Sequence, residues 1–126
     1  MMSKPLKVLF VSAEVAPFSS VGGLSQVAYF LPKALKKAGV DIRVFTPKYG
    51  SINSALLQTQ NVMQGLKVPT GEDEHSSHPQ ELVCNIKVLK SSKKGDLIIY
   101  FLENMEYYEQ RANVYNYSDD HIRFGL

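Results

Sequence analysis

The sequence has little cysteine, little net charge and no long apolar run, and each of these shortages excludes a class of protein. A single cysteine, Cys84, leaves no internal disulfide framework and favours a reducing compartment. The formal net charge of +2 is small for a dedicated nucleic-acid binder, which has to neutralise many phosphates. No apolar run reaches the ~20 residues of a membrane-spanning helix, and residues 1–7 lack the apolar core of a secretory signal. We therefore expect a cytoplasmic protein that binds neither nucleic acid nor membrane.

The composition itself fits a globular domain. The chain has 126 residues, of which 44% are hydrophobic and 21% are charged, close to the average of soluble proteins. A chain of this length can build one core that hides roughly two-thirds of its unfolded surface. The sequence therefore predicts a folded chain with a single core.

The first part of the chain predicts a strand, a loop, a helix and a second strand. Residues 6–12 are mostly apolar, typical of a strand buried on both faces of a parallel sheet. Apolar positions then recur at three- and four-residue spacing over residues 24–38, with Gly39 as the expected C-terminal cap. Pro32 lies inside this helix and should kink it about one turn earlier. Residues 40–46 form the second strand, which completes a β-α-β unit.

After this unit the pattern changes to strands without a long helix between them. Strand candidates cover residues 61–68, 81–90 and 96–102, and the last two flank a hairpin-length connection at 91–95. Residues 69–79 show no apolar periodicity and predict an exposed, mobile loop. The expected fold class is α/β, a Rossmann-like parallel sheet with an inserted antiparallel β-hairpin. One crossover supplies too few helices to cover both faces of such a sheet, so we expect a partial domain.

The most informative stretch is the loop that leads into the helix through Gly22 and Gly23. It leaves the carboxyl end of the first strand, where α/β proteins bind ligands, and a helix start offers unpaired amides and a positive dipole end. Adjacent glycines also let the backbone approach an anion closely. The pattern indicates a phosphate or pyrophosphate site. It is neither G-x-G-x-x-G nor a Walker loop, so a simple turn of the chain is an equal alternative on these grounds.

The order of several short blocks carries a resemblance to a known family. Six of them are similar to the amino-terminal segment of bacterial glycogen synthases and plant starch synthases: KVLFVSAEVAPF (7–18), VGGL (21–24), LPKAL (31–35), RVFTPKYG (43–50), ENMEYY (103–108) and YSDDHIRF (117–124). Each block is weak alone, but together they run the whole length of the chain.

The resemblance implies a retaining glycosyltransferase of the two-domain GT-B type. Such an enzyme moves glucose from ADP-glucose to the non-reducing end of an α-1,4-glucan acceptor, with no metal and no cofactor besides the nucleotide-sugar substrate. It implies that residues 1–126 are the first part of the N-terminal domain, with the rest of that domain and the second domain absent. We expect this piece alone to be inactive and to contain no catalytic residue. Neither the donor nucleotide nor the oligomeric state follows from the sequence.

The resemblance also assigns individual contacts. Ser20, Gly22 and Gly23 would bind the donor, but the family usually has a lysine that reaches the donor phosphates where this chain has Ser20. A serine keeps one hydrogen bond and loses the charge. Glu14 matches the family's Ser-x-Glu, and Gln26 stands where an acid is common. Each is a candidate sugar or loop contact; we favour a loop-bracing role for Glu14 and weigh a neutral surface role for Gln26.

Two other functions compete with a synthase. A non-catalytic glucan-binding or regulatory relative would also lack the donor-phosphate lysine. A small, generic Rossmann nucleotide binder would explain the glycine loop, but it would leave the later blocks as coincidence. The residues after Leu126 in the complete gene would discriminate between the first two functions.

Two clusters of polar residues suggest chemistry more weakly. His75 and His78 stand beside three acids at a spacing that could suit a metal, but a solvated loop is the far better interpretation. Residues 119–123 resemble an acid/base cluster, yet the resemblance makes Arg123 and Phe124 the start of a helix that packs on the sheet.

The tyrosines near the end of the chain allow two interpretations. Their rings could cover the apolar face of a sugar, or they could be half-buried with hydroxyls that reach water. They are Tyr107, Tyr108, Tyr115 and Tyr117. Cys84 is expected to be a small buried hydrophobic residue within its strand.

Overall fold

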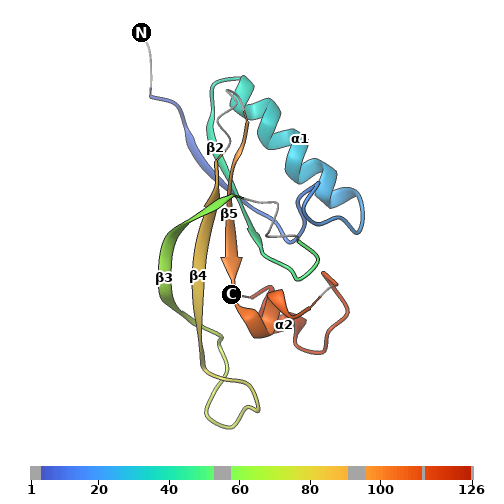
Figure 1. The fold of residues 1–126 in the computed structure, drawn as a ribbon, viewed down its shortest axis with the longest axis vertical. Helices are drawn as coiled ribbons and strands as arrows, with labels where there is room; N and C mark the ends of the chain where they lie inside the picture. Colours follow the sequence, from blue (N-terminus) through green and yellow to red (C-terminus); the bar gives the residue numbers. More distant parts are fainter. Residues whose placement is uncertain (1–3, 53–57, 91–95, 112, 126) are drawn as a thin grey trace.

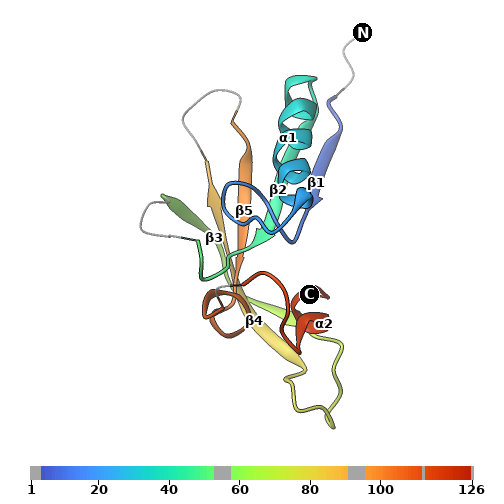
Figure 2. The same cartoon turned by 90° about the vertical axis from the view of Figure 1, so that its right-hand side faces the viewer.

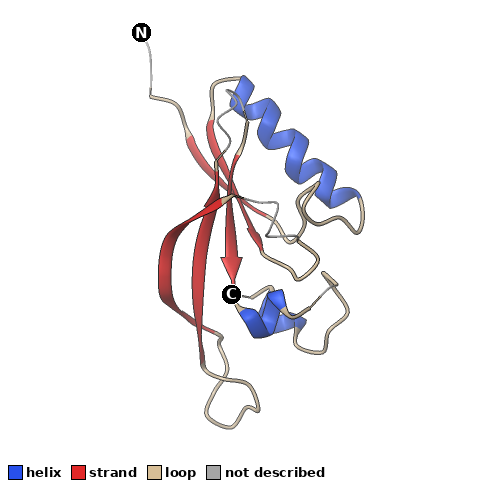
Figure 3. Ribbon diagram, viewed as in Figure 1, coloured by secondary structure: helices blue, strands red, loops and turns tan. Residues whose placement is uncertain are grey.

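The computed structural model describes residues 4–52, 58–90, 96–111 and 113–125, and its main feature is a five-stranded sheet in the order β1-β2-β5-β4-β3 (Figure 1 and Figure 3). The strands are β1 (Lys7–Val11), β2 (Asp41–Pro47), β3 (Thr59–Pro69), β4 (Glu81–Leu89) and β5 (Ile98–Glu103). The helices are α1 (Gly23–Lys37), the short π-helix η1 (Met105–Glu109) and α2 (Asp120–Arg123). The predicted hairpin connection at 91–95 lies outside the described residues.

One half of the sheet is parallel. β1 pairs with β2 and β2 pairs with β5, both in parallel register, and α1 connects β1 to β2. α1 lies along one face of this half (Figure 2), where its Ala28 and Pro32 are buried. Val44 and Phe101 form the centre of the core with no exposed surface. The predicted β-α-β unit and the α/β fold class are confirmed.

The other half of the sheet is antiparallel. β4 runs antiparallel to β5, and β3 runs antiparallel to β4, so the inserted strands extend the same sheet and do not form a separate layer. β4 alternates between buried and exposed residues, whereas β3 is exposed along most of its length. Cys84 of β4 is 1% exposed, as expected of a small buried hydrophobic residue, and burial raises the pKa of its thiol.

The prediction that the first strand is buried on both faces is wrong. β1 is an edge strand of the described sheet, and its Leu9 and Val11 side chains are 58% and 67% exposed. An apolar run shows that a strand is suited to burial, but the strand is buried only if neighbouring elements cover it. In the ranges that the structure describes, β1 has a strand neighbour on one side only.

The helix prediction is close to the observed helix. α1 continues through Pro32; it starts at Gly23, one residue before the expected start, and ends at Lys37, one residue before the expected end, and Figure 1 draws it as one helix. Gly39 follows with a φ of 101°, the left-handed conformation for which a glycine is suited. No helix in the described ranges is long and apolar enough to cross a membrane.

Candidate functional site

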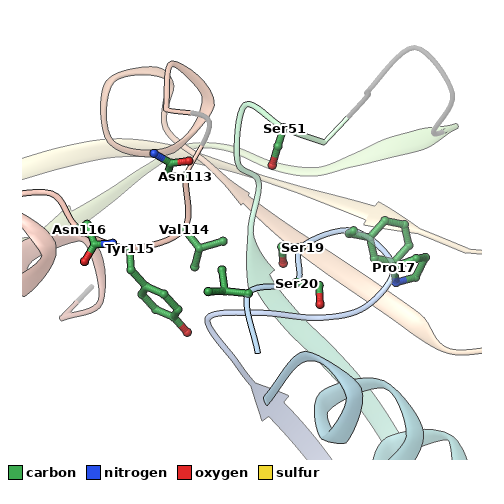
Figure 4. Close-up of a pocket in the computed structure, with 10 residues that line it drawn as sticks. Pro17, Ser19, Ser20, Ser51, Asn113, Val114, Tyr115 and Asn116 are labelled. Atoms are coloured by element: carbon green, nitrogen blue, oxygen red, sulfur yellow. The ribbon is translucent and has the colours of Figure 1, made fainter. Parts of the chain in front are cut away.

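Three loops meet just beyond the carboxyl ends of the parallel strands and line a pocket of about 580 Å³ (Figure 4). The loop after β1 contributes residues 17–21, the loop after β2 contributes Ser51, and the segment after β5 contributes residues 113–116. The carboxyl ends of parallel strands lie at the same edge of a sheet, and α/β proteins bind ligands in the crevice at that edge. The sheet topology therefore builds a pocket at the place where the sequence predicts a ligand site.

Glu14 joins the two principal walls of this pocket. Its carboxylate is buried, and one oxygen, Oε1, accepts hydrogen bonds from the amides of Val21 (2.8 Å) and Gly22 (3.1 Å). The other oxygen, Oε2, accepts one from the hydroxyl of Tyr115 at 2.6 Å, 101 residues further along the chain. Figure 4 shows the Tyr115 ring extending from the late segment toward the early loop. Glu14 thus braces the early loop and ties it to the late segment.

The surroundings of Glu14 keep it ionised. Burial alone would raise the pKa of its carboxyl, but the hydrogen bonds from Tyr115 and from the amides of Val21 and Gly22 together outweigh burial and lower it. Burial, followed by the hydrogen bond to Glu14, raises the pKa of Tyr115 to about 12. At neutral pH the pair is therefore a carboxylate and a protonated hydroxyl.

Ser20, predicted as a donor contact, has a hydroxyl partner inside the protein. Its Oγ lies 2.8 Å from Oγ of Ser25, a fully buried residue in the first turn of α1. Ser25 in turn donates to the carbonyl of Gly22 at 2.9 Å, so Ser20 is the donor of the pair. The hydroxyl of Ser20 therefore contacts the helix start while the residue lines the pocket.

The glycine pair has open space in front of it. Gly22 directly precedes α1 and has an extended backbone (φ −149°), which any residue can adopt. A Cβ built at Gly22 or at Gly23 meets no atom within 4 Å. The amide of Gly22 is bonded to Glu14, and in the described part of the chain no partner is found for the amide of Gly23. An anion at the helix start would therefore meet the Gly23 amide first.

Gln26 does not join the site. It is exposed on α1 and is not among the residues that line the pocket.

The tyrosines of the late segment divide into two groups. Tyr107 and Tyr108 are buried, and the hydroxyl of Tyr108 donates to the carbonyl of Arg123, so neither can offer its ring to a sugar. Tyr117 is half-buried against the guanidinium of Arg123, with its ring centre 4.6 Å from the guanidinium carbon. Of the four, only Tyr115 lines the pocket.

The expectation that Arg123 and Phe124 start a helix is wrong for the described residues. Arg123 ends the four-residue helix α2, and Phe124 follows as its C-cap. The Arg123 side chain turns inward and donates to main-chain carbonyls, so its position is set by contacts that the local sequence does not contain. Asp119 pairs with Arg111, and that contact lowers the pKa of the Asp119 carboxyl. The Arg123 and Asp119 side chains therefore stabilise the segment after β5, and their contacts are not those of an acid/base pair in a pocket.

The histidines of the 69–79 segment contact other side chains of the protein. Across the residues that the structure describes, no group of three His, Cys, Asp or Glu side chains is placed to hold a metal ion. His78 packs edge-on against His121 with ring centres 5.9 Å apart. Glu72 lies 3.0 Å from Nε2 of His121, and this hydrogen bond lowers the pKa of the Glu72 carboxyl.

Sequence reasoning missed Ser25 and Ser51. Ser25 follows Gly22 by three residues, the spacing at which a serine hydroxyl bonds back to a carbonyl of its own helix, so its role carried a local signal. Ser51 carried none, because its place in the pocket depends on how the loop after β2 lies against the other two loops.

A parallel β-α-β core with a pocket at its carboxyl edge defines a Rossmann-type ligand-binding unit. Residues 7–126 match the family model described as the starch synthase catalytic domain, and the chain belongs to that family. The match confirms the resemblance carried by the six sequence blocks.

Relatives agree with this assignment. The glycogen synthase of Caldicellulosiruptor saccharolyticus is 41% identical over 120 residues, which cover 95% of this chain and 23% of that protein. The glycogen synthase of Anoxybacillus flavithermus is 40% identical over 120 residues, covering 95% of this chain and 22% of that protein. This chain therefore spans less than a quarter of the length of these relatives.

A solved structure supports the fold. The catalytic domain of starch synthase IV from Arabidopsis thaliana, bound to ADP and acarbose, superposes with a TM-score of 0.74 at 23% identity. The superposition covers 95% of this chain and 23% of that one.

Proposed function

We propose that this chain is the N-terminal portion of a glycogen or starch synthase, which transfers glucose from ADP-glucose to the non-reducing end of an α-1,4-glucan with retention. The observation that carries the proposal is the family match over residues 7–126, in a chain whose pocket lies at the ligand-binding edge of the sheet. Residues 1–126 then form the first part of the N-terminal domain and are inactive alone. A cytoplasmic location is part of the proposal, in keeping with the single buried thiol of Cys84.

The pocket suits the neutral sugar of the acceptor. Its lining, residues 17–21, Ser51 and 113–116, offers serine hydroxyls, asparagine amides and a tyrosine, and none of these side chains is charged. Hydroxyls and amides match the donors and acceptors of a glucan, and the rings of Phe18 and Tyr115 match the apolar face of a sugar ring. We therefore assign the α-1,4-glucan to this pocket.

The helix start suits the phosphates of the donor. Sugar transfer leaves negative charge on the departing diphosphate, and without a metal that charge has to meet cations, amides or hydroxyls. The amide of Gly23 and the dipole of α1 contribute roughly 0.3–2 kcal/mol. Gly22 and Ser20 lie beside it, although their amide and hydroxyl already bond to Glu14 and Ser25. We propose that these three residues contact the donor, and that a second domain of the full-length synthase provides most of the donor site.

The chemistry of the helix start also favours the alternative function. Ser20 supplies no positive charge where the family usually has lysine. The negatively charged Glu14 carboxylate lies next to the Gly22 amide and accepts its hydrogen bond. Both features weaken the attraction for a diphosphate. A non-catalytic glucan-binding relative would keep the pocket and lose donor use.

Activity assays on the full-length gene product separate the two functions. We expect transfer of glucose from radiolabelled ADP-glucose to maltooligosaccharides in the native protein. Ser20→Lys should restore the charged phosphate contact and improve kcat/KM for ADP-glucose by about ten- to a hundredfold. Ser20→Ala is the matched control and should not improve it. An unchanged KM and turnover in Ser20→Lys would count against donor binding at this position.

A binding experiment tests the glucan pocket directly. A titration with maltooligosaccharide, monitored by amide chemical shifts, should move the resonances of residues 18–21 and 113–116. Absence of transfer together with glucan binding would favour the non-catalytic relative. Silence of these resonances at millimolar sugar would contradict the assignment of the pocket.

A further inference from the structure

Arg123 is a buried charge that the proposed reaction does not use. The residue is 1% exposed, and its guanidinium donates to the main-chain carbonyls of Tyr107 (2.8 Å), Val114 (2.9 Å) and Asn113 (3.4 Å). It also donates to the carboxylate of Asp120 at 2.8 Å. One side chain therefore holds several separate stretches of the segment that follows β5.

The surroundings make this cation tolerable inside the protein. A buried charge is costly unless it is paired and hydrogen-bonded. Besides the carbonyls and Asp120, aromatic rings surround the guanidinium carbon at centre distances of 4.6–5.8 Å: Tyr117, Phe124, Tyr49 and Tyr108. The planar guanidinium satisfies these partners in a fixed geometry that a lysine ammonium cannot reproduce.

Two of the carbonyls that Arg123 holds belong to the wall of the pocket. Asn113 and Val114 line the pocket, and the next residue is Tyr115, whose hydroxyl meets Glu14. Arg123 itself does not line this pocket. Asp120 acts on the same wall, because its Oδ2 accepts the amide of Asn116 at 3.0 Å while Oδ1 accepts from Arg123.

We propose that Arg123 is a positioning residue of the glucan pocket: by holding the carbonyls of Asn113 and Val114 it places Tyr115 against Glu14. This inference rests on the proposed glucan-binding function of the pocket. Arg123 touches neither sugar nor donor and acts through the main chain of the wall.

Arg111 offers a matched control. It lies on the same segment, and its guanidinium makes a two-point contact with the carboxylate of Asp119 and donates to the carbonyl of Glu106. It contacts neither the Asn113 nor the Val114 carbonyl. Loss of Arg111 therefore weakens the anchoring of the segment without releasing the pocket wall.

The experiment compares Arg123→Lys with Arg111→Lys in the full-length gene product. The first readout is the Kd for maltooligosaccharide, and the second is the hydroxyl titration of Tyr115 followed by NMR of labelled tyrosine. Arg123→Lys should weaken maltooligosaccharide binding about five- to tenfold. It should also lower the pKa of Tyr115 from about 12 part of the way toward the ordinary tyrosine value, because burial still raises this pKa but the contact with Glu14 is lost. Arg111→Lys should change the affinity by less than about twofold and leave the titration in place.

Asp120→Ala keeps the test decisive if Arg123→Lys does not fold. It removes the carboxylate that orients Arg123 and holds the Asn116 amide, so we expect the same two changes at smaller size. Unchanged affinity and an unchanged Tyr115 titration in the folded variants would overturn the inference, as would equal effects of Arg111→Lys and Arg123→Lys. If the native protein binds no maltooligosaccharide, the proposed function fails, and the Tyr115 titration alone decides whether Arg123 places that residue.

Discussion

Two buried glutamates show how differently this fold can hold a carboxylate. Glu14 and Glu103 are 3% and 6% exposed, and the pKa of each lies below its usual range although burial opposes this. Glu103 owes this to cations, with Nζ of Lys48 at 3.0 Å and Nζ of Lys87 at 3.2 Å. Glu14 owes it to neutral donors, two amides and the hydroxyl of Tyr115.

The two glutamates differ in whether a cation neutralises their charge, and this decides whether a ligand can sense that charge. The charge of Glu103 is neutralised where it lies, so this cluster joins β5 to its neighbours and presents no uncompensated negative charge. In the described residues no lysine or arginine pairs with Glu14, so a net negative charge stays at the wall of the pocket. Dipoles can hold an ionised carboxylate without cancelling its field, and a ligand at the helix start meets that field.

Lys48→Met should produce the largest loss of stability. The substitution leaves Glu103 buried with only the half-exposed Lys87 as a cationic partner, and breaking a buried ion pair costs about 3–5 kcal/mol. The measurement is the free energy of unfolding in urea. Lys87→Met is the control and should cost about 1 kcal/mol or less, because that side chain is 32% exposed. Equal losses in the two variants would contradict the distinction.

Glu14→Gln should destabilise the protein less than Lys48→Met does, and it should strengthen anion binding. The variant loses hydrogen bonds to a charged acceptor and should cost about 1.5–3 kcal/mol in the free energy of unfolding. Removal of the negative charge should also tighten ADP binding by about threefold, measured by calorimetry on the full-length gene product. Glu106→Gln, at an exposed position of η1, should change neither quantity. Weaker ADP binding in Glu14→Gln would show that its charge does not oppose the diphosphate.

Tyr115→Phe should cost less than Glu14→Gln. It removes one of the three donors to the carboxylate and should lower the free energy of unfolding by about 1 kcal/mol. The pKa of Glu14 should rise in this variant, which carboxyl chemical shifts can follow. Tyr29→Phe is the control and should be close to neutral, because among the described residues the Tyr29 hydroxyl accepts only a 3.4 Å hydrogen bond from Lys33 at the surface.

The acid dependence of stability should show the smallest effect. The pKa of Glu14 is lower in the folded state than in the unfolded chain, so its contribution is complete above the unfolded value of ~4.3 and is lost as the pH falls through the folded value. Stability should therefore fall on acidification, and Glu14→Gln should flatten part of that fall. Urea midpoints between about pH 6 and pH 3 measure it. An identical acid slope in both proteins would contradict the lowered pKa.

Strand and helix positions followed from the sequence because their signals are local. Hydrophobic periodicity predicted a strand at residues 81–90, and β4 covers Glu81–Leu89. The exposure of β1 did not follow, because burial depends on neighbours that the periodicity of one strand cannot report. The loop at the carboxyl end of the first strand predicted the ligand-binding edge, and the family resemblance predicted Ser20, Gly22 and Gly23 as contacts, but neither predicted the hydrogen bonds within the loop.

Within the site, the sequence predicted the loop that lines the pocket and the bracing role of Glu14, which its bonds to the Val21 and Gly22 amides confirm, but it missed the other contacts that hold this loop. The absence of a lysine at Ser20 was visible, whereas the bond between Ser20 and Ser25 was not. The pairing of Glu14 with Tyr115 spans 101 residues, so no spacing rule could predict it. The inward turn of Arg123 likewise depends on carbonyls that only the folded segment brings together.

The position of β1 at the end of the sheet has a consequence for the handling of this chain. An outer strand with an apolar face is a template onto which another strand can add, and Leu9 and Val11 make that addition favourable. Purified residues 1–126 should therefore self-associate as concentration rises. A lysine at position 9 or 11 would act as a gatekeeper and keep the material monomeric for solution work.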